Sequence, residues 1–330
     1  MLERPYHPAL PLRNGHIQTF LASSSLRALG PNPMRAISRA EVLTTEAGVR
    51  LLGWRSRQTA ASSKALVVLL HGWEGSADST YMRRTGQSLH QRGYEVFRLN
   101  FRDHGPSHHL NRGIFFASRV DEVFDAVSRL SLAARPAPVF LVGFSLGANF
   151  ALRIALLCGR RPIANLRHVV AVSPVLDPQE STRRADRHPI IRRYFMKKWR
   201  RSLALKQRLF PNDYRFDAVL RSRTIQAATD LILERYSDFP SSRAYFEAYT
   251  LTGTALQDLP LSATLLTSAD DPIIPVENFE DLRLNPATRL IVHRYGGHIG
   301  FLEGPALRSR YEDDLPDLFD RMQGEAHLYP

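Results

Sequence analysis

Short apolar runs alternate with amphipathic stretches along the first half of the chain. Four apolar runs have the length of strands and are bounded by turn residues; they occupy 65–70, 94–100, 139–142 and 168–173. Runs of this kind are typical of strands that are buried on both faces. Between them, residues 79–92 and 120–130 show apolar positions at helical spacing. The alternation predicts an α/β protein with a mostly parallel sheet covered by helices on both faces.

The pattern changes after residue 175. Residues 176–256 contain no run that resembles a buried strand and are predicted to form several helices rich in Arg, Tyr and Phe. Strand-like segments return at 263–267 and 289–293. We therefore expect a core made of residues 1–175 and 257–330, with 176–256 inserted as a helical cap. Sites in open α/β sheets lie at the carboxyl ends of the strands, so the cap is expected to cover the site.

The two ends of the chain give weaker patterns. Residues 36–44 and 49–55 are predicted to pair as strands around a turn near Gly48, and the proline-rich stretch before them is predicted to be irregular. At the other end, residues 306–322 have the pattern of a closing helix.

The composition is that of an ordinary globular protein, with 44% hydrophobic and 23% charged residues among 330. The single cysteine, Cys158, excludes an internal disulfide and favours a reducing compartment; we expect it to be a buried packing thiol. No apolar run approaches the roughly 18 residues that span a bilayer, and the first residues lack the apolar segment of a signal peptide. We expect a cytoplasmic protein, with peripheral contact to a membrane as an alternative.

Positive charge is concentrated in the expected cap. The chain has a net charge of +12, and residues 183–208 contain eleven Lys and Arg against one acid, Asp186. One local basic block indicates either a solvated helix face or a local anionic partner, such as lipid headgroups. Nucleic acid is not expected as a partner, because no recognised binding motif accompanies the charge.

The segment around Ser145 says most about function. The apolar run 139–142 leads into Gly-x-Ser-x-Gly and then into a helix-forming stretch, 148–158. A strand, a tight turn and a helix in this order form the setting of a nucleophile elbow. Gly143 and Gly147 leave room for the turn, and Ser145 would stand at its tip. Ser145 is therefore the candidate nucleophile.

A serine hydroxyl needs a base to take its proton. The loop after strand 263–267 carries Asp270 and Asp271, and the loop after strand 289–293 carries His298 beside glycines. When the serine stands on such an elbow, the acid and then the histidine are expected later in the chain, each on a loop after a strand. We expect His298 to be the general base and Asp271 to orient it. Asp270 would cap the turn, although an exchange of roles between the two acids stays open.

A tetrahedral oxyanion needs two preorganised donors. The backbone N–H of Leu146 would be one, because the elbow places it at the start of the helix. The other should come from the loop after strand 65–70, where His71-Gly72 keeps the backbone accessible. The backbone N–H of Trp73 is the candidate.

Two further groups of residues were considered for chemistry. His104, His108 and His109 are more consistent with a hydrogen-bonded loop near the site mouth than with a metal site, because no matching ligand spacing occurs elsewhere. His16 and Gln18 are expected to tie the N-terminal arm to the core, with a contact to substrate as the alternative.

Together these motifs resemble the α/β-hydrolase superfamily, and in detail its YheT-like branch, also called ABHD1/2/3-like or AB hydrolase-4. The motifs that carry the resemblance are Asn14-Gly15-His16-Ile17-Gln18-Thr19, His71-Gly72-Trp73-Glu74-Gly75-Ser76, Gly143-Phe144-Ser145-Leu146-Gly147-Ala148-Asn149, Asp270-Asp271-Pro272 and Gly296-Gly297-His298-Ile299-Gly300-Phe301. The Asn-x-His-x-Gln-Thr element is the most specific of them. The resemblance implies an α/β-hydrolase fold, a Ser145, Asp271, His298 triad and no cofactor.

The resemblance also implies hydrolysis of carboxylic esters, with lipid esters or phospholipids as substrates of some relatives. The long basic cap departs from the branch, so the substrate itself is not carried over. We therefore expect a serine ester hydrolase acting on small-molecule or lipid esters through an acyl-enzyme. An acyltransferase on the same triad and a non-catalytic lipid-binding protein of this fold are the alternatives.

Overall fold

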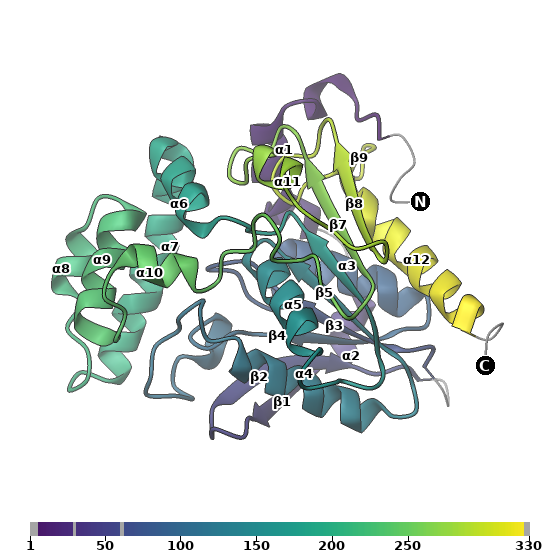
Figure 1. The fold of residues 1–330 in the computed structure, drawn as a ribbon, viewed down its shortest axis with the longest axis horizontal. Coiled ribbons are helices and arrows are strands. Elements are labelled where there is room, and N and C mark those ends of the chain that lie inside the picture. The colour runs from purple at the N-terminus through teal and green to yellow at the C-terminus, as the bar shows by residue number, and fades with distance from the viewer. Residues whose placement is uncertain (1–5, 29–30, 60–62, 327–330) are drawn as a thin grey trace.

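The computed structural model describes residues 6–28, 31–59 and 63–326. Its centre is an eight-stranded sheet with the order β1-β2-β4-β3-β5-β6-β7-β8 (Figure 1). The strands are β1 Arg39–Thr44, β2 Arg50–Ser56, β3 Leu66–Leu70, β4 Glu95–Leu99, β5 Val139–Phe144, β6 Leu166–Val172, β7 Ala263–Ser268 and β8 Thr288–His293. Only the β1–β2 and β2–β4 pairs in this sheet are antiparallel. The predicted mostly parallel sheet is confirmed.

Helices cover both faces of the sheet. Leu66, Val68 and Leu70 of β3 join the core beneath α4 (Asp121–Ala134) and α5 (Leu146–Leu157). Val67 and Leu69 point to the opposite face, where α3 (Thr80–Gln91) and α12 (Arg310–Ala326) pack against each other. Burial on both sides explains why this strand is a continuous apolar run instead of an alternating one.

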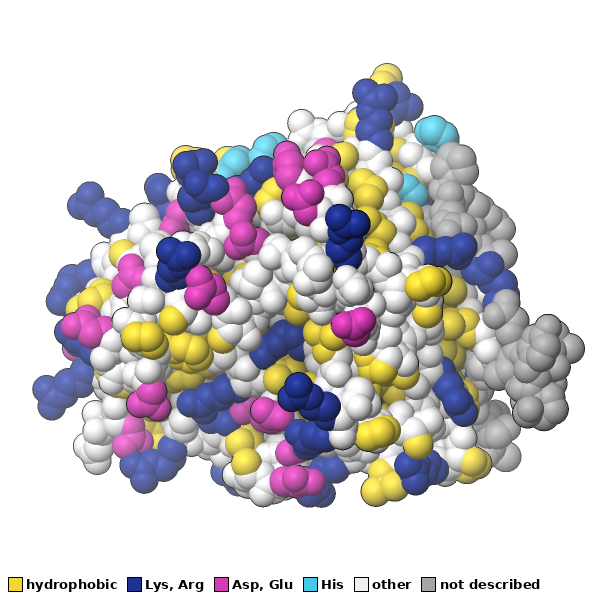
Figure 2. Space-filling view, in the orientation of Figure 1, with side chains coloured by type: hydrophobic (Ala, Val, Ile, Leu, Met, Phe, Trp, Pro, Cys, Tyr) yellow, Lys and Arg dark blue, Asp and Glu magenta, His cyan; other side chains and the backbone are white. Residues whose placement is uncertain are grey.

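Between β6 and β7 the chain leaves the sheet and forms five helices at one side of the molecule (Figure 1, left). They are α6 Pro178–Arg187, α7 Pro189–Leu209, α8 Asp217–Arg221, α9 Ile225–Tyr236 and α10 Ser242–Glu247. We call α6–α10 the helical insertion. Its helices pack on one another, with α6 against both α7 and α9. Arg and Lys side chains project around its outer edge (Figure 2, left).

The ends of the chain differ from the prediction. The first strand begins at Arg39 and not at Ala36, because α2 (Pro33–Ile37) precedes it; Pro33 stands at the first helical position and the Asn32 side chain caps the helix. The closing helix begins at Arg310, because the residues before it pair as the short strands β9 (Leu302–Glu303) and β10 (Arg308–Ser309).

The N-terminal stretch, predicted to be irregular, contains the helix α1 (Gly15–Ala22), which Asn14 caps through its side chain. The remaining short elements are η1 Leu10–Leu12, η2 Ser25–Ala28, η3 Gly105–Ser107 and α11 Glu277–Glu280. Within the described ranges, no helix combines the length and the apolar character needed to cross a membrane.

Candidate active site

Ser145 stands at a strained turn between β5 and α5. Its backbone has φ 55° and ψ −116°, a region that residues other than glycine rarely adopt. The glycines on either side make the turn feasible, because a Cβ at Gly143 would lie 2.2 Å from the carbonyl oxygen of Gly147. A Cβ at Gly147 would lie 2.3 Å from the carbonyl oxygen of Leu70. The sharp turn thus holds Ser145 at the carboxyl end of the central strand.

Three side chains from distant parts of the chain meet at this point. Nε2 of His298 lies 2.8 Å from Oγ of Ser145, and Nδ1 of His298 lies 2.8 Å from Oδ2 of Asp271. Ser145, Asp271 and His298 are all largely buried. This continuous chain of hydrogen bonds allows His298 to take a proton from Ser145 while Asp271 fixes the ring.

The two neighbouring acids have different contacts. Oδ1 of Asp271 accepts hydrogen bonds from the backbone N–H groups of Ile273 and Ile274, at 2.8 and 2.9 Å, while Oδ2 faces His298. Oδ1 of Asp270 instead accepts from the N–H of Gly297, at 2.8 Å. The structure therefore brings Asp271 to the imidazole of His298, whereas Asp270 bonds the backbone of the loop that carries His298.

The loop after β3 runs directly against Ser145. A Cβ at Gly72 would lie 3.1 Å from the Cβ of Ser145, so a larger residue would crowd the nucleophile. In the described part of the chain, the N–H groups of Trp73 and Leu146 have no hydrogen-bond partner, whereas the N–H of Ser145 is taken up by the carbonyl of Val172. Two free backbone donors thus flank Ser145, which is what an oxyanion requires.

The N-terminal helix α1 supports the loop of His298. Oε1 of Gln18 accepts a hydrogen bond from the N–H of Leu302, and its Nε2 donates to the hydroxyl of Tyr6. Gln18 therefore ties the N-terminal arm to the core, as predicted. His16 behaves differently, because its ring lies against that of His188 in the helical insertion, with centroids 4.5 Å apart.

Thr19 was not singled out from the sequence, although it belongs to the Asn-x-His-x-Gln-Thr element. Its hydroxyl accepts a hydrogen bond of 2.9 Å from the backbone N–H of His298 and donates to the carbonyl of Gly15. Its place at the end of this motif could have marked Thr19 as a candidate. Its partner could not be predicted, because His298 lies 279 residues away in sequence.

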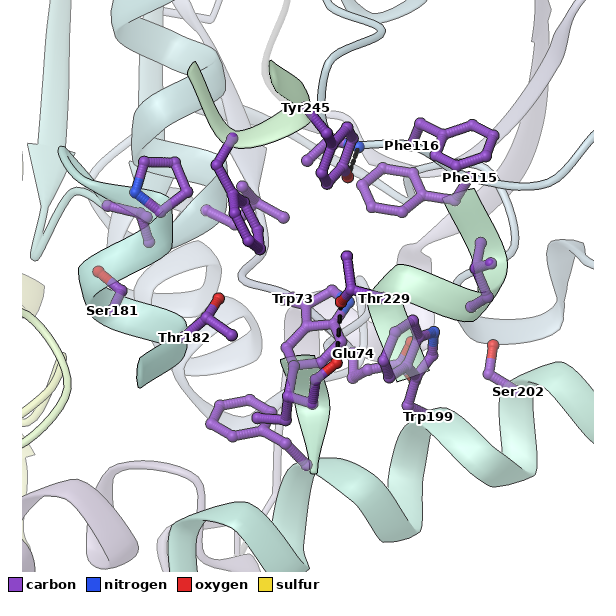
Figure 3. Close-up of a pocket in the computed structure, with 18 of the residues that line it drawn as sticks. Trp73, Glu74, Phe115, Phe116, Ser181, Thr182, Trp199, Ser202, Thr229 and Tyr245 are labelled. Carbon is purple, nitrogen blue, oxygen red and sulfur yellow. Dashed lines mark hydrogen bonds between the residues drawn. The ribbon is translucent and has the colours of Figure 1, made fainter. Parts of the chain in front are cut away.

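Two cavities open on either side of Ser145. The first, of about 150 Å³, lies between the core and the helical insertion and is shown in Figure 3. The second, of about 330 Å³, is bounded by α1, α3 and α7 and includes His298. Trp73, Phe195 and Ile273 line both cavities together with Ser145. The Trp73 ring stacks on Phe195, with centroids 5.2 Å apart, so this pair forms part of the wall of both cavities.

The histidine-rich loop is bonded to its surroundings. His104 is buried; its Nε2 accepts from the N–H of Glu74, and its Nδ1 lies 2.8 Å from the carbonyl of Arg102. His108 contacts the hydroxyl of Ser202 in α7, while His109 is exposed. Burial lowers the pKa of both His104 and His108 to about 4. Across the residues that the structure describes, no three His, Cys, Asp or Glu side chains gather as a metal site would require.

A buried ion pair joins the same loop to the helical insertion. Nζ of Lys206 in α7 lies 2.8 Å from Oδ1 of Asp103 and also donates to the carbonyls of Asn111 and Gly113. Burial raises the pKa of Asp103 to about 6 even though Lys206 acts in the opposite direction.

Cys158 is buried after α5, and burial raises the pKa of its thiol.

An elbow serine, a carboxylate and a histidine, placed in this chain order on a mostly parallel sheet, are the arrangement of an α/β hydrolase. The model of the Alpha/beta hydrolase family matches residues 67–308, and the chain belongs to this family. The fold prediction is therefore confirmed.

Named relatives agree with this assignment. An "Abhydrolase domain-containing protein" of Dictyostelium discoideum is 24% identical over 321 residues, which cover 94% of this chain and 78% of that protein. The Escherichia coli (strain K12) protein named "Putative esterase YheT" is 23% identical over 272 residues, covering 81% and 79%. These relatives agree with the YheT-like branch, and their names support hydrolase activity in general.

Solved structures show the same fold. The esterase Pf2001 of Pyrococcus furiosus superposes with a TM-score of 0.55 at 19% identity, covering 89% of this chain and 97% of that one. An esterase of Pyrobaculum calidifontis gives a TM-score of 0.56 at 16% identity, covering 94% and 92%. At these identities the likeness concerns the fold alone.

Proposed function

We propose that the protein is a serine hydrolase that cleaves carboxylic esters through an acyl-enzyme on Ser145. The observation that carries this proposal is the unbroken chain of 2.8 Å contacts from Ser145 through His298 to Asp271. Nε2 of His298 is hydrogen-bonded to the Ser145 hydroxyl, which makes His298 the candidate base.

In the proposed reaction, Oγ of Ser145 attacks the ester carbonyl carbon while Nε2 of His298 takes the hydroxyl proton. The N–H groups of Trp73 and Leu146 stabilise the oxyanion, a contribution typically worth about 10²–10³ in rate for one donor. The imidazolium, stabilised by Asp271, then gives its proton to the departing alcohol oxygen. A water molecule, deprotonated by His298, attacks the acyl-enzyme and releases the acid.

The cavities favour an ester with an apolar part. Aromatic and aliphatic side chains form most of the first cavity wall, among them Phe115, Trp199 and Tyr249. An acyl chain buried there would gain the usual hydrophobic free energy of about 0.8 kcal/mol per methylene. Lipid and phospholipid acyl esters are therefore the substrate classes that we propose to test first.

The test is hydrolysis of p-nitrophenyl esters from acetate to palmitate by the wild type and by Ser145→Ala. We expect Ser145→Ala to lower kcat by a factor of about 10⁶, as removal of the nucleophilic serine does in other serine hydrolases. Covalent labelling of Ser145 by a fluorophosphonate tests the nucleophile without any assumption about the substrate. Adding acceptor alcohols reveals an acyltransferase as a new ester product. If the wild type neither hydrolyses any ester nor reacts with the fluorophosphonate, a non-catalytic lipid-binding protein is the remaining alternative.

We further propose that α7 contacts anionic lipid surfaces. The outward face of this helix carries Ile190, 61% exposed, and Tyr194, 37% exposed, alongside the exposed Arg193, Lys197 and Arg201. Apolar and basic side chains on one helix face are typical of interfacial binding. Tyr194 also lines the second cavity, so the contact would bring the site mouth to the lipid.

Sedimentation with vesicles of phosphatidylserine and phosphatidylcholine tests this contact. We expect binding that rises with the anionic fraction and falls with salt, and that is weakened in Lys197→Glu/Arg201→Glu. Equal binding to purely zwitterionic vesicles, or an unchanged affinity in the double variant, would contradict it.

A further inference from the structure

The cavity beside Ser145 contains one carboxyl group whose presence the proposed reaction does not explain. Glu74 follows the candidate oxyanion residue Trp73 directly and lies on the wall of the first cavity. Figure 3 labels it near Trp73 and Trp199. Its side chain neither touches Ser145 through a hydrogen bond nor joins the Asp271–His298 pair.

The other charged or titratable acid–base groups on this wall are already satisfied. Asp103 is paired with Lys206, and both nitrogens of His104 have backbone partners. The carboxyl of Glu74, by contrast, forms no hydrogen bond or ion pair with any residue that the structure describes. The ammonium group of Lys198, which acts electrostatically on Glu74, donates to the backbone carbonyl of Glu74, at 3.1 Å.

Keeping a glutamate at this position is costly in two ways. Its backbone has φ 53°, in the left-handed region that glycine and asparagine adopt more easily. Its half-buried carboxyl also lacks a protein partner in the described structure, and desolvation raises its pKa to about 8. Strain and an unpaired polar group at one residue beside a site indicate a functional role.

The division of the two cavities suggests which part of a substrate meets Glu74. In the proposed reaction His298 must protonate the departing alcohol, and only the second cavity includes His298. The alcohol part therefore belongs in the second cavity and the acyl part in the first, where Glu74 lies. This assignment rests on the proposed function.

We propose that Glu74 selects acyl groups that carry a hydroxyl on an otherwise apolar chain. A protonated carboxyl offers both a donor and an acceptor, so it can bond a hydroxyl in both directions. The wall around it is apolar and aromatic, which suits the rest of the chain. A cationic acyl group fits less well, because the ammonium group of Lys198 already exerts a positive field on Glu74.

The experiment compares p-nitrophenyl octanoate with octanoates that carry one hydroxyl at successive carbons. We expect the wild type to hydrolyse one of the hydroxylated esters with kcat/KM about tenfold above the parent, which corresponds to about 1.4 kcal/mol. Glu74→Leu should abolish or reverse that preference, because the hydroxyl is then buried without a partner. Glu74→Gln should retain most of it, because an amide also donates and accepts.

Thr182→Val is the matched control, since it removes another polar group from the same wall without touching Glu74. Its hydroxyl preference should equal that of the wild type. Absence of a preference above twofold at every carbon, or equal losses in Thr182→Val and Glu74→Leu, would overturn the proposal. Loss in Glu74→Gln together with a preference for an ω-ammonium ester would assign Glu74 to a cation instead.

Fluorophosphonate labelling of Ser145 separates this proposal from the one on which it rests. A wild type that is labelled and hydrolyses all the octanoates without selectivity would show that Glu74 selects nothing while the hydrolase remains. A wild type that is neither labelled nor active would show that both proposals are wrong.

Discussion

The backbone N–H of His298 donates a hydrogen bond of 2.9 Å to the hydroxyl of Thr19. Thr19 lies on α1 near the start of the chain, and its hydroxyl is held in turn by the carbonyl of Gly15, at 2.6 Å. The N-terminal helix therefore fixes the loop that presents the imidazole to Ser145. A residue that never touches the reacting atoms thus positions one that does.

Thr19→Val should lower kcat on p-nitrophenyl esters by about 10- to 100-fold with little change in KM, because a small displacement of His298 misaligns proton transfer. Thr19→Ser keeps the hydroxyl and should restore most of the rate. The thermal midpoint of both variants should remain close to that of the wild type. A parallel fall in kcat and stability, without rescue by serine, would reduce Thr19 to a packing role.

Sequence patterns could predict those features that depend on local order. The inner strands β3 and β5 to β7 are buried along nearly their whole length, and the loops carrying Ser145, Asp271 and His298 each follow a strand-like segment. The positions and order of these residues were therefore visible in the sequence. The choice between Asp270 and Asp271 was not, because it depends on which carboxylate the turn directs to the ring and which to the N–H of Gly297.

Contacts between distant segments could not be predicted. Nothing in the sequence near Lys206 indicates that Asp103 is its partner. The basic block was expected to form a solvated face or to meet an anionic partner, and neither expectation identifies a lysine that is only 1% exposed. Likewise the strained backbone of Glu74 has no composition signal, since glutamate is an ordinary surface residue. The start of β1 was placed too early because a proline can begin a helix as well as interrupt a strand.

Lys206→Met should destabilise the protein by about 3–5 kcal/mol, because it leaves Asp103 buried without its partner. Adding Asp103→Asn should recover part of this loss, since a neutral amide is less costly to bury. Urea unfolding of the two single variants, the double variant and the wild type gives the coupling free energy. Additive losses in the double variant would mean that the pair does not act as a unit.

Glu74→Gln should stabilise the protein more at pH 8 than at pH 5. The pKa of Glu74 is raised from 4.5 to about 8 by burial, so the folded state binds a proton that the unfolded state releases over this range. Wild-type stability contributed by this group is therefore present at low pH and is lost as pH rises toward 8. Glutamine carries no such proton.

Urea unfolding at pH 5, 6.5 and 8 measures the effect, which we expect to reach about 1–4 kcal/mol at pH 8. Asp103, which also raises the pKa of Glu74, is present in both proteins. A difference between variant and wild type that does not change with pH would mean that Glu74 is already ionised in the folded protein.

Gly15→Ala should damage the site through backbone crowding alone. A Cβ at this position would lie 1.9 Å from the carbonyl oxygen of Asp270. The backbone of Gly15 is also packed closely on the loop of His298, because a Cβ placed on Gly297 would lie 2.3 Å from the carbonyl oxygen of Gly15. Helix α1 and the two loops that carry Asp271 and His298 can therefore make room only by moving apart. We expect a loss of stability of about 1–3 kcal/mol, as overpacking usually causes, together with a lower kcat.

Gly324→Ala is the matched control, because no atom lies within 4 Å of a Cβ at that position and it also lies in a helix. It should be neutral or should stabilise the protein by about 0.5–1 kcal/mol, the usual gain of alanine over glycine in a helix. Thermal unfolding and ester turnover measured on both variants decide the matter. If Gly15→Ala keeps wild-type turnover, α1 does not support the loop of His298 in the way that its contact with Thr19 indicates.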